Sequence, residues 1–196
     1  MINSSKTTTL SHYPQIAGLL PSDSNIEFIG IRETKQVLWM QHGNNHHFVD
    51  LPIHYFNLLK EAYTNDINAV KFLTKIADKL NRQIELFTYY MYGDVDSTPD
   101  INNGVLSESE NFRDSQKCPS LLWNSKNLTI GDHILTERQL LIIDLISEDL
   151  PDKAIAATLE ISAKTLDFHK TKLYKAVGVN TKTALLALAF KNKIIS

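Results

Sequence analysis

The C-terminal segment of the chain carries a concentration of positive charge. Between Lys164 and Ser196 there are seven lysines and one acidic residue, Asp167, which gives this segment a net charge of +6. The whole chain has a net charge of −2. A basic block of this kind is typical of proteins that contact phosphate groups, so nucleic acid is the first ligand class to consider.

Other groupings of reactive side chains are weak. His42, His46 and His47 surround a Gly-Asn-Asn turn, and neither a cysteine nor a nearby carboxylate pair completes a ligand set, so we predict no metal site. The single cysteine, Cys118, can form neither an internal disulfide nor a thiolate zinc site within one chain. Without a Walker loop, a nucleophile elbow or a paired-carboxylate motif, the sequence supports neither an enzyme nor a cofactor.

Composition and hydropathy restrict where such a protein works. The chain has 196 residues, of which 43% are hydrophobic and 21% charged, as in ordinary globular proteins. Its longest strongly apolar stretch, ALLALAF at 184–190, is far shorter than the roughly 20 residues that cross a bilayer. The first residues, MINSSKTTTL, lack the apolar core of a signal peptide. We therefore expect a cytoplasmic protein with no membrane partner.

Four helices are predicted in the last sixty residues. The first follows a cap at Thr136, the second starts near Pro151, the third runs from Ser162 to Gly178, and the fourth covers 181–193. The second and third helices are separated by a tight turn, which indicates a helix-turn-helix. In that motif the second helix, here about 163–177, enters a DNA major groove about 12 Å wide.

Ordered motifs support this interpretation. The segment contains Leu135-Thr136-x-Arg138, Leu145-Ile146, Lys153-x-Ile155-Ala156, Leu159-x-Ile161-Ser162, Lys164-Thr165, His169 and Gly178-Val179. On these residues, 135–196 resembles the DNA-binding domain of LuxR/NarL-type bacterial transcription regulators, a four-helix unit. A sigma-factor region shares the Leu-Thr-x-Arg start, but the Gly-Val turn and the apolar fourth helix favour the LuxR type.

Three positions depart from the family pattern. Gln139 stands where the family usually has Glu, Asp149 where it usually has Gly, and Asp167 where it often has Lys. The change at Gln139 affects a salt bridge, the change at Asp149 affects a turn, and the change at Asp167 affects DNA specificity.

The third helix has two distinct faces. Because each residue advances about 100° around a helix, Leu166, Leu173 and Val177 lie within about 20° of one direction and should be buried. The opposite side and its flanks carry Lys164, Asp167, Phe168, Thr171, Lys172 and Lys175. We predict that this side meets DNA.

The resemblance implies a role for each exposed residue. Asp167, Phe168 and Thr171 hold positions that approach base edges. Lys164, Thr165 and Lys172 hold positions that approach phosphates, helped by the free N–H groups of the helix N-terminus. Ordinary structural roles stay open: Phe168 could pack on the N-terminal domain, the lysines could be merely solvated, and Asp167 could cap the helix or repel DNA.

The N-terminal region reads as a small α+β domain. Two strands joined by a turn at 33–35 are predicted over 26–41, and another turn with a short strand follows. Helices are expected at 53–63 and at 66–81, the latter capped by Asp66 and with an apolar stripe through Ile67, Val70, Ile76 and Leu80. The aromatic run 84–92 is predicted to be a strand, and 93–125 a long loop.

The role of this region is the least determined by the sequence. It lacks the repeated βα pattern of a phosphorylated receiver domain and the signature of an autoinducer-binding domain. A small α+β sensor, for example PAS-like, and a plain dimerisation module both remain. The aromatic cluster Phe87, Tyr89, Tyr90 and Tyr92 could line a ligand pocket or cover a partner, although core packing explains at least half of it.

The sequence therefore predicts an α+β fold with two domains. Residues 1–115 form a regulatory or dimerisation domain, 116–134 a linker, and 135–196 a helix-turn-helix domain. The predicted function is sequence-specific regulation of transcription, with double-stranded DNA, a second copy of the chain and RNA polymerase as candidate partners and any small ligand unknown. The alternative is a protein-interaction adaptor with a degenerate helix-turn-helix.

Overall fold

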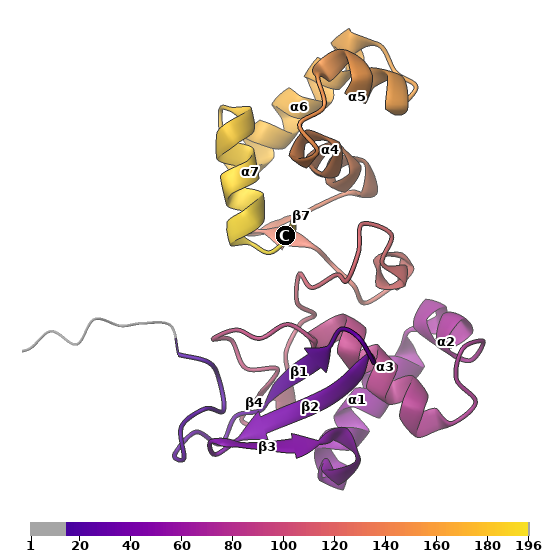
Figure 1. The fold of residues 1–196 in the computed structure, drawn as a ribbon, viewed down its shortest axis with the longest axis vertical. Coiled ribbons are helices and arrows are strands. Elements are labelled where there is room, and N and C mark those ends of the chain that lie inside the picture. Colours follow the sequence, from indigo (N-terminus) through magenta and orange to yellow (C-terminus); the bar gives the residue numbers. More distant parts are fainter. Residues whose placement is uncertain (1–14, 196) are drawn as a thin grey trace, which may run out of the picture.

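The computed structural model describes residues 15–195, and Figure 1 shows a sheet-and-helix part followed by a purely helical part. The first part contains β1 (Glu27–Ile31), β2 (Gln36–Gln41), β3 (Asn44–His47), a 3-10 turn (Phe48–Asp50), α1 (Ile53–Asn65), α2 (Ile67–Leu73) and α3 (Leu80–Tyr92). The connecting segment contains β4 (Ile101–Asn102), β5 (Val105–Leu106), a 3-10 turn (Pro119–Leu122), β6 (Thr129–Ile130) and β7 (His133–Ile134). The helical part contains α4 (Glu137–Ser147), α5 (Asp152–Thr158), α6 (Ala163–Val177) and α7 (Lys182–Lys191).

The N-terminal sheet is an antiparallel meander in the order β1-β2-β3. Phe28 lies opposite Trp39, and the turn between the first two strands ends at Lys35, whose φ is 54°. Buried Phe28 and Val37 project toward the helices. These strands and their polar turn confirm the hairpin predicted for 26–41.

The aromatic run 84–92 is helical, so the strand predicted there is wrong. It forms most of α3, which packs against β1 and β2. Every residue from Leu86 to Tyr92 is buried, because this helix lies in the middle of the N-terminal part. A helix that is covered on all sides has no polar stripe, and its periodicity cannot be distinguished from that of a buried strand.

The helix predicted for 66–81 is also shorter than expected. Asp66 does cap α2, since its carboxylate accepts a hydrogen bond from the Ala69 N–H at 2.9 Å. The helix ends at Leu73, however, and Ala69 and Leu73 are its buried residues. The predicted stripe was misplaced: Ile67, Ile76 and Leu80 are 74%, 54% and 42% exposed.

The connecting segment is mostly irregular, as predicted for 93–125, but it packs into both cores. Phe112, Cys118 and Trp123 are buried in the N-terminal core, where Trp123 stacks on Phe87 at 5.6 Å between ring centroids. Leu128 and Ile130 are buried among the C-terminal helices. The aromatic residues Phe87, Tyr89, Tyr90 and Tyr92 are likewise core residues, with at most 3% exposure.

The C-terminal part has the four predicted helices. Thr136, Ser162 and Thr181 cap α4, α6 and α7 through side-chain oxygens that accept backbone N–H groups. Gly178 ends α6 at φ 75°, a left-handed conformation that glycine adopts without steric cost. The α+β fold class and the helical C-terminal domain are thus confirmed.

Within residues 15–195, none of the helices has the length and apolar character that a bilayer crossing demands. The predictions made for residues 1–14 lie outside the described residues.

Candidate nucleic-acid interface

The helix-turn-helix is formed by α5 and α6. Between them Glu160 adopts φ 55°, which turns the chain within the few residues 159–162. Leu166 and Leu173 of α6 are buried against the same core as Ile155 and Leu159. This core fixes which side of α6 faces outward.

All seven predicted DNA-contacting residues are exposed to solvent. They are Lys164, Thr165, Asp167, Phe168, Thr171, Lys172 and Lys175. Phe168 is 64% exposed, so it does not pack on the N-terminal domain. An aromatic side chain left in water on the first turns of this helix is available for an apolar contact with a partner.

The seven lysines of the basic block divide into two groups. Lys170 pairs with Asp152 at 2.8 Å, Lys182 with Asp149 at 2.9 Å, and Lys193 with Asp94 at 2.6 Å. Among residues 15–195, no ion pair involves the other members, Lys164, Lys172, Lys175 and Lys191. The positive charge available to a ligand is therefore concentrated on α6.

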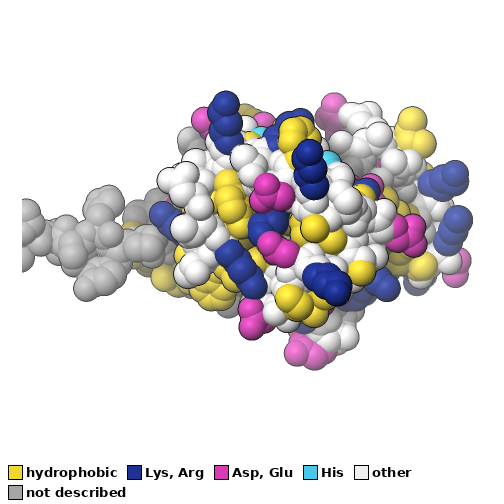
Figure 2. All heavy atoms as spheres, turned by 90° about the horizontal axis from the view of Figure 1, so that it is seen from above, with side chains coloured by type: hydrophobic (Ala, Val, Ile, Leu, Met, Phe, Trp, Pro, Cys, Tyr) yellow, Lys and Arg dark blue, Asp and Glu magenta, His cyan; other side chains and the backbone are white. Residues whose placement is uncertain are grey.

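Positive charge does not form one continuous patch at this end of the molecule. Figure 2, the view from above, shows Lys and Arg side chains interspersed with acidic and apolar ones. Asp167 contributes a carboxylate to the exposed face of α6 itself. A surface of mixed sign favours contacts with particular groups over uniform attraction to any polyanion.

The first turn of α6 also provides backbone N–H groups as hydrogen-bond donors. The Ser162 hydroxyl accepts the Thr165 N–H at 3.1 Å and lies 2.8 Å from the Thr165 hydroxyl. This cap uses the Thr165 N–H, so the N–H groups of Ala163 and Lys164 remain at the helix start without an intrahelical acceptor. Such N–H groups, with the positive end of the helix dipole, favour an anion.

Two departures from the family pattern have visible structural consequences. The Gln139 side chain accepts the Thr136 N–H at 2.9 Å and completes a capping box at the start of α4. Asp149 adopts φ 56°, a conformation that strains most residues other than glycine, and its carboxylate pairs with Lys182. The third, Asp167, is exposed as expected.

A buried ion pair between the connecting segment and α4 was missed by the sequence reasoning. Arg113 donates to both oxygens of Asp144, and its guanidinium also donates to the Ile194 carbonyl. Both side chains are only 7% exposed. The available signal was an acidic residue within the apolar run LLIIDLI, but the sequence did not indicate its partner.

Comparison with known proteins shows what the C-terminal segment is similar to. Residues 133–189 match the family described as bacterial regulatory proteins, luxR family. This segment is therefore similar to LuxR-type helix-turn-helix domains. The chain is also 35% identical over 72 residues to the oxygen regulatory protein NreC of Staphylococcus aureus strains JH9, JH1 and Mu3, a match that covers 37% of this chain and 33% of each relative. No solved structure matches the chain.

The match to the luxR family ends at residue 189, before the last residues of the C-terminal part. Ile194 lies beyond the matched segment yet is fully buried in the same core, and its carbonyl accepts from Arg113. The match also starts after Arg113. Arg113, which precedes the matched region, therefore contacts both Asp144 inside it and Ile194 beyond it.

Proposed function

We propose that the chain is a sequence-specific DNA-binding regulator of transcription. The observation that carries this proposal is the exposed face of α6 in a LuxR-type domain. That face combines lysines that form no ion pair within residues 15–195 with Phe168, whose side chain is 64% exposed. No core contact accounts for such a combination, whereas a major groove offers phosphates at its edges and thymine methyl groups on its floor.

The exposed residues divide by the chemistry of their partners. Lys164, Lys172 and Lys175, with the Thr165 hydroxyl, bind phosphates. Asp167, Phe168 and Thr171 approach base edges. The Asp167 carboxylate accepts a hydrogen bond from the cytosine amine, and the Phe168 ring packs on a thymine methyl group. The Thr171 hydroxyl forms a hydrogen bond with either a donor or an acceptor of a base.

The regulator acts as a dimer in this proposal, and residues 1–115 control or mediate its dimerisation. Paired recognition helices in such dimers lie about 34 Å apart, so the binding site is a pseudo-palindrome with half-sites about one DNA turn apart. The protein would work in the cytoplasm, where RNA polymerase is a further candidate partner.

Selection of bound sequences from random duplexes at two salt concentrations tests the proposal. A regulator enriches a defined, pseudo-palindromic sequence, and the enrichment persists at the higher salt because base contacts do not depend on counterion release. Enrichment of a single asymmetric half-site by a stable monomer would remove the dimer.

A protein-interaction adaptor is the second candidate, and the observation that favours it is the exposed Asp167 carboxylate on α6. An adaptor would enrich no sequence in the same selection. It would also lose a protein partner, and not DNA, when Lys164, Lys172 and Phe168 are replaced.

A further inference from the structure

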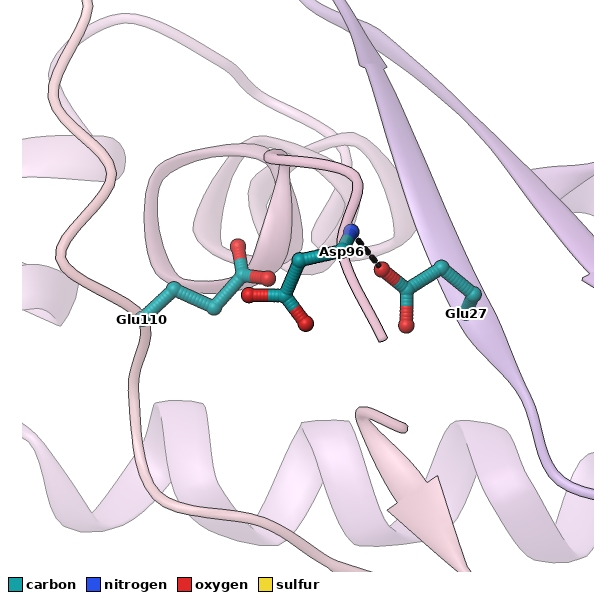
Figure 3. Close-up of side chains that lie close together, drawn as sticks. All are labelled: Glu27, Asp96 and Glu110. Carbon is teal, nitrogen blue, oxygen red and sulfur yellow. Dashed lines mark hydrogen bonds between the residues drawn. The ribbon is translucent and has the colours of Figure 1, made fainter. Parts of the chain in front are cut away.

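Three carboxylates from distant parts of the chain converge in the N-terminal part. Glu27 comes from β1, Asp96 from the loop after α3, and Glu110 from the connecting segment, and Figure 3 shows Asp96 lying between the other two. One oxygen from each side chain lies within 4.8 Å of one from each of the others. Like charges at such distances repel strongly unless protons or a cation intervene.

Glu27 contributes a buried oxygen without a hydrogen-bond donor to this cluster. Its side chain is fully buried, and its Oε1 accepts the Asp96 N–H at 2.6 Å, as drawn in Figure 3. Among the described residues, Glu27 Oε2 has no hydrogen-bond partner, and neither has Glu110 Oε1. A buried carboxylate oxygen without a donor costs about 1–3 kcal/mol or more, so both oxygens are poised to accept a ligand.

Lys193 is the positive group that faces the cluster most directly. Its ammonium lies 2.6 Å from Asp94 Oδ2 and 3.5 Å from Asp96 Oδ2, and it donates to the Val95 carbonyl at 3.1 Å. The Lys193 side chain is 40% exposed. Lys193 and the buried Lys126 are fewer than the carboxylates of this group, which also includes the buried Asp100.

A cavity lies beside Asp96 and Glu110, and Glu27 is not part of its lining. It has a volume of about 310 Å³, and its lining includes Asp96, Asp100, Glu110 and Lys193. The volume is sufficient for an ion with several waters, because one water needs about 30 Å³.

Burial governs the charge state of these carboxylates when nothing is bound. It raises the pKa of Glu27 to about 8, although the Asp96 N–H lowers it, and it raises the pKa of Glu110 to about 9. The pKa of Asp100 is also raised by burial. The other ionisable groups facing the cluster are Tyr92, Asp94, Lys126 and Lys193.

We propose that Glu27, Asp96 and Glu110 bind one hard divalent cation of the Ca²⁺ type, in competition with Lys193. Carboxylate oxygens are the ligands that Ca²⁺ prefers, at about 2.3–2.6 Å. Two oxygens on opposite sides of such an ion are about 5 Å apart, which fits the observed spacing. The site is separate from the DNA-binding proposal and does not depend on it.

Calorimetric titration of the chelator-treated full chain with CaCl₂, and separately with MgCl₂, tests this proposal. We expect one saturable Ca²⁺ site with a Kd of about 10⁻⁵ to 10⁻³ M, as for weaker calcium sites.

Matched variants decide whether these residues are the ligands. Glu27→Gln should weaken Ca²⁺ binding at least tenfold, whereas Glu61→Gln, which removes an exposed carboxylate on α1, should leave it unchanged. Lys193→Met should strengthen binding severalfold because it removes the competing ammonium. If Glu27→Gln does not fold, Asp96→Asn serves in its place.

Several outcomes would overturn the proposal. If there is no saturable heat, or if the Glu27 and Glu61 variants bind alike, then Glu27, Asp96 and Glu110 do not bind Ca²⁺. Tighter binding of Mg²⁺ at the same residues would overturn the calcium assignment. Weaker binding by Lys193→Met would rule out competition with the ammonium.

Discussion

The two parts of the chain place their charged groups in opposite ways. On α6, Lys164, Lys172 and Asp167 are exposed and lie opposite a buried leucine face. In the N-terminal part and the connecting segment, Glu27 and Lys126 are buried, and Lys126 donates to the Tyr90 carbonyl at 2.8 Å.

This difference determines how each part responds to solution conditions. Exposed charges meet ligands through a field that salt screens. Buried charges are protected from salt, but their altered pKa values link folding to pH. Salt should therefore probe the α6 surface, whereas pH should probe the N-terminal core.

The largest expected effect comes from breaking the junction between the parts. Asp144→Ala should lower the free energy of unfolding by about 3–5 kcal/mol, because it leaves the Arg113 guanidinium buried without its carboxylate. Urea denaturation followed by circular dichroism measures the change.

A double variant separates this cost from a general packing defect. Replacing the pair by Arg113→Met with Asp144→Leu should recover most of the lost stability, because no uncompensated charge remains. A double variant as unstable as Asp144→Ala would contradict this explanation.

Replacing the outward residues of α6 should have a smaller effect, on recognition and not on folding. Phe168→Ala or Thr171→Ala should cost about 1–3 kcal/mol of binding to the selected site and leave nonspecific binding nearly unchanged. Leu173→Ala is the control: it should lower stability by about 2–5 kcal/mol without changing which sequence is preferred. Competition binding with specific and random duplexes distinguishes the two faces. Loss of stability in the Phe168 variant would show that this ring belongs to the core.

The N-terminal part should lose stability as pH rises. The folded-state pKa values of Glu27 and Glu110 lie above their ordinary value of 4.5, so the folded state binds more protons than the unfolded state. Their contribution is complete below about pH 4.5 and is lost as pH rises toward about 8 to 9. We expect the free energy of unfolding to fall between pH 5 and pH 8 in the presence of a chelator.

Tryptophan fluorescence in urea measures this fall, because both tryptophans of the chain, Trp39 and Trp123, lie in the N-terminal core. The lowered pKa of Lys126, about 8, opposes this fall near and above pH 8, because the unfolded state holds that proton to higher pH. Glu27→Gln should flatten the dependence. A stability that instead rises from pH 5 to 8 in the unaltered chain would show that these carboxylates are ionised in the folded protein.

The smallest predicted effect is at the turn after α4. Asp149→Gly should raise stability by about 0.5–1 kcal/mol, because glycine adopts the left-handed φ of 56° without strain. Loss of the pair with Lys182 should matter little, since the Asp149 side chain is 96% exposed. Thermal denaturation measures the change, and a decrease in stability would mean that the ion pair outweighs the strain.

The same difference between the parts explains how much could be predicted from sequence. The helices of the LuxR-type domain are short, amphipathic and capped by Thr136, Ser162 and Gly178, so local rules fixed both their ends and their buried sides. The exposed site residues followed from the same periodicity. Their contacts with DNA stay a prediction.

The N-terminal part depends on contacts between distant residues. The run 84–92 is aromatic and β-prone, yet it forms a helix that the surrounding strands and helices bury. Glu27 and Asp96 are 69 residues apart, as Asp144 and Arg113 are 31 apart, and neither pairing follows from local sequence. The boundaries at 115 and 135 also remain predictions.

The central claim is that the exposed face of α6 binds DNA phosphates, and a charge-matched comparison tests it most directly. One variant replaces Lys164, Lys172 and Lys175 by Ala, and a control replaces the exposed Lys60, Lys71 and Lys75 of the N-terminal part, so both lose three positive charges. The dependence of DNA affinity on salt concentration is measured for each. The slope of the logarithm of DNA affinity against the logarithm of salt concentration should become less steep by about one unit for each lysine replaced on α6, counted in every bound copy of the chain. For the control variant the slope should hardly change. Equal slopes for the two variants, or no change in either, would contradict it.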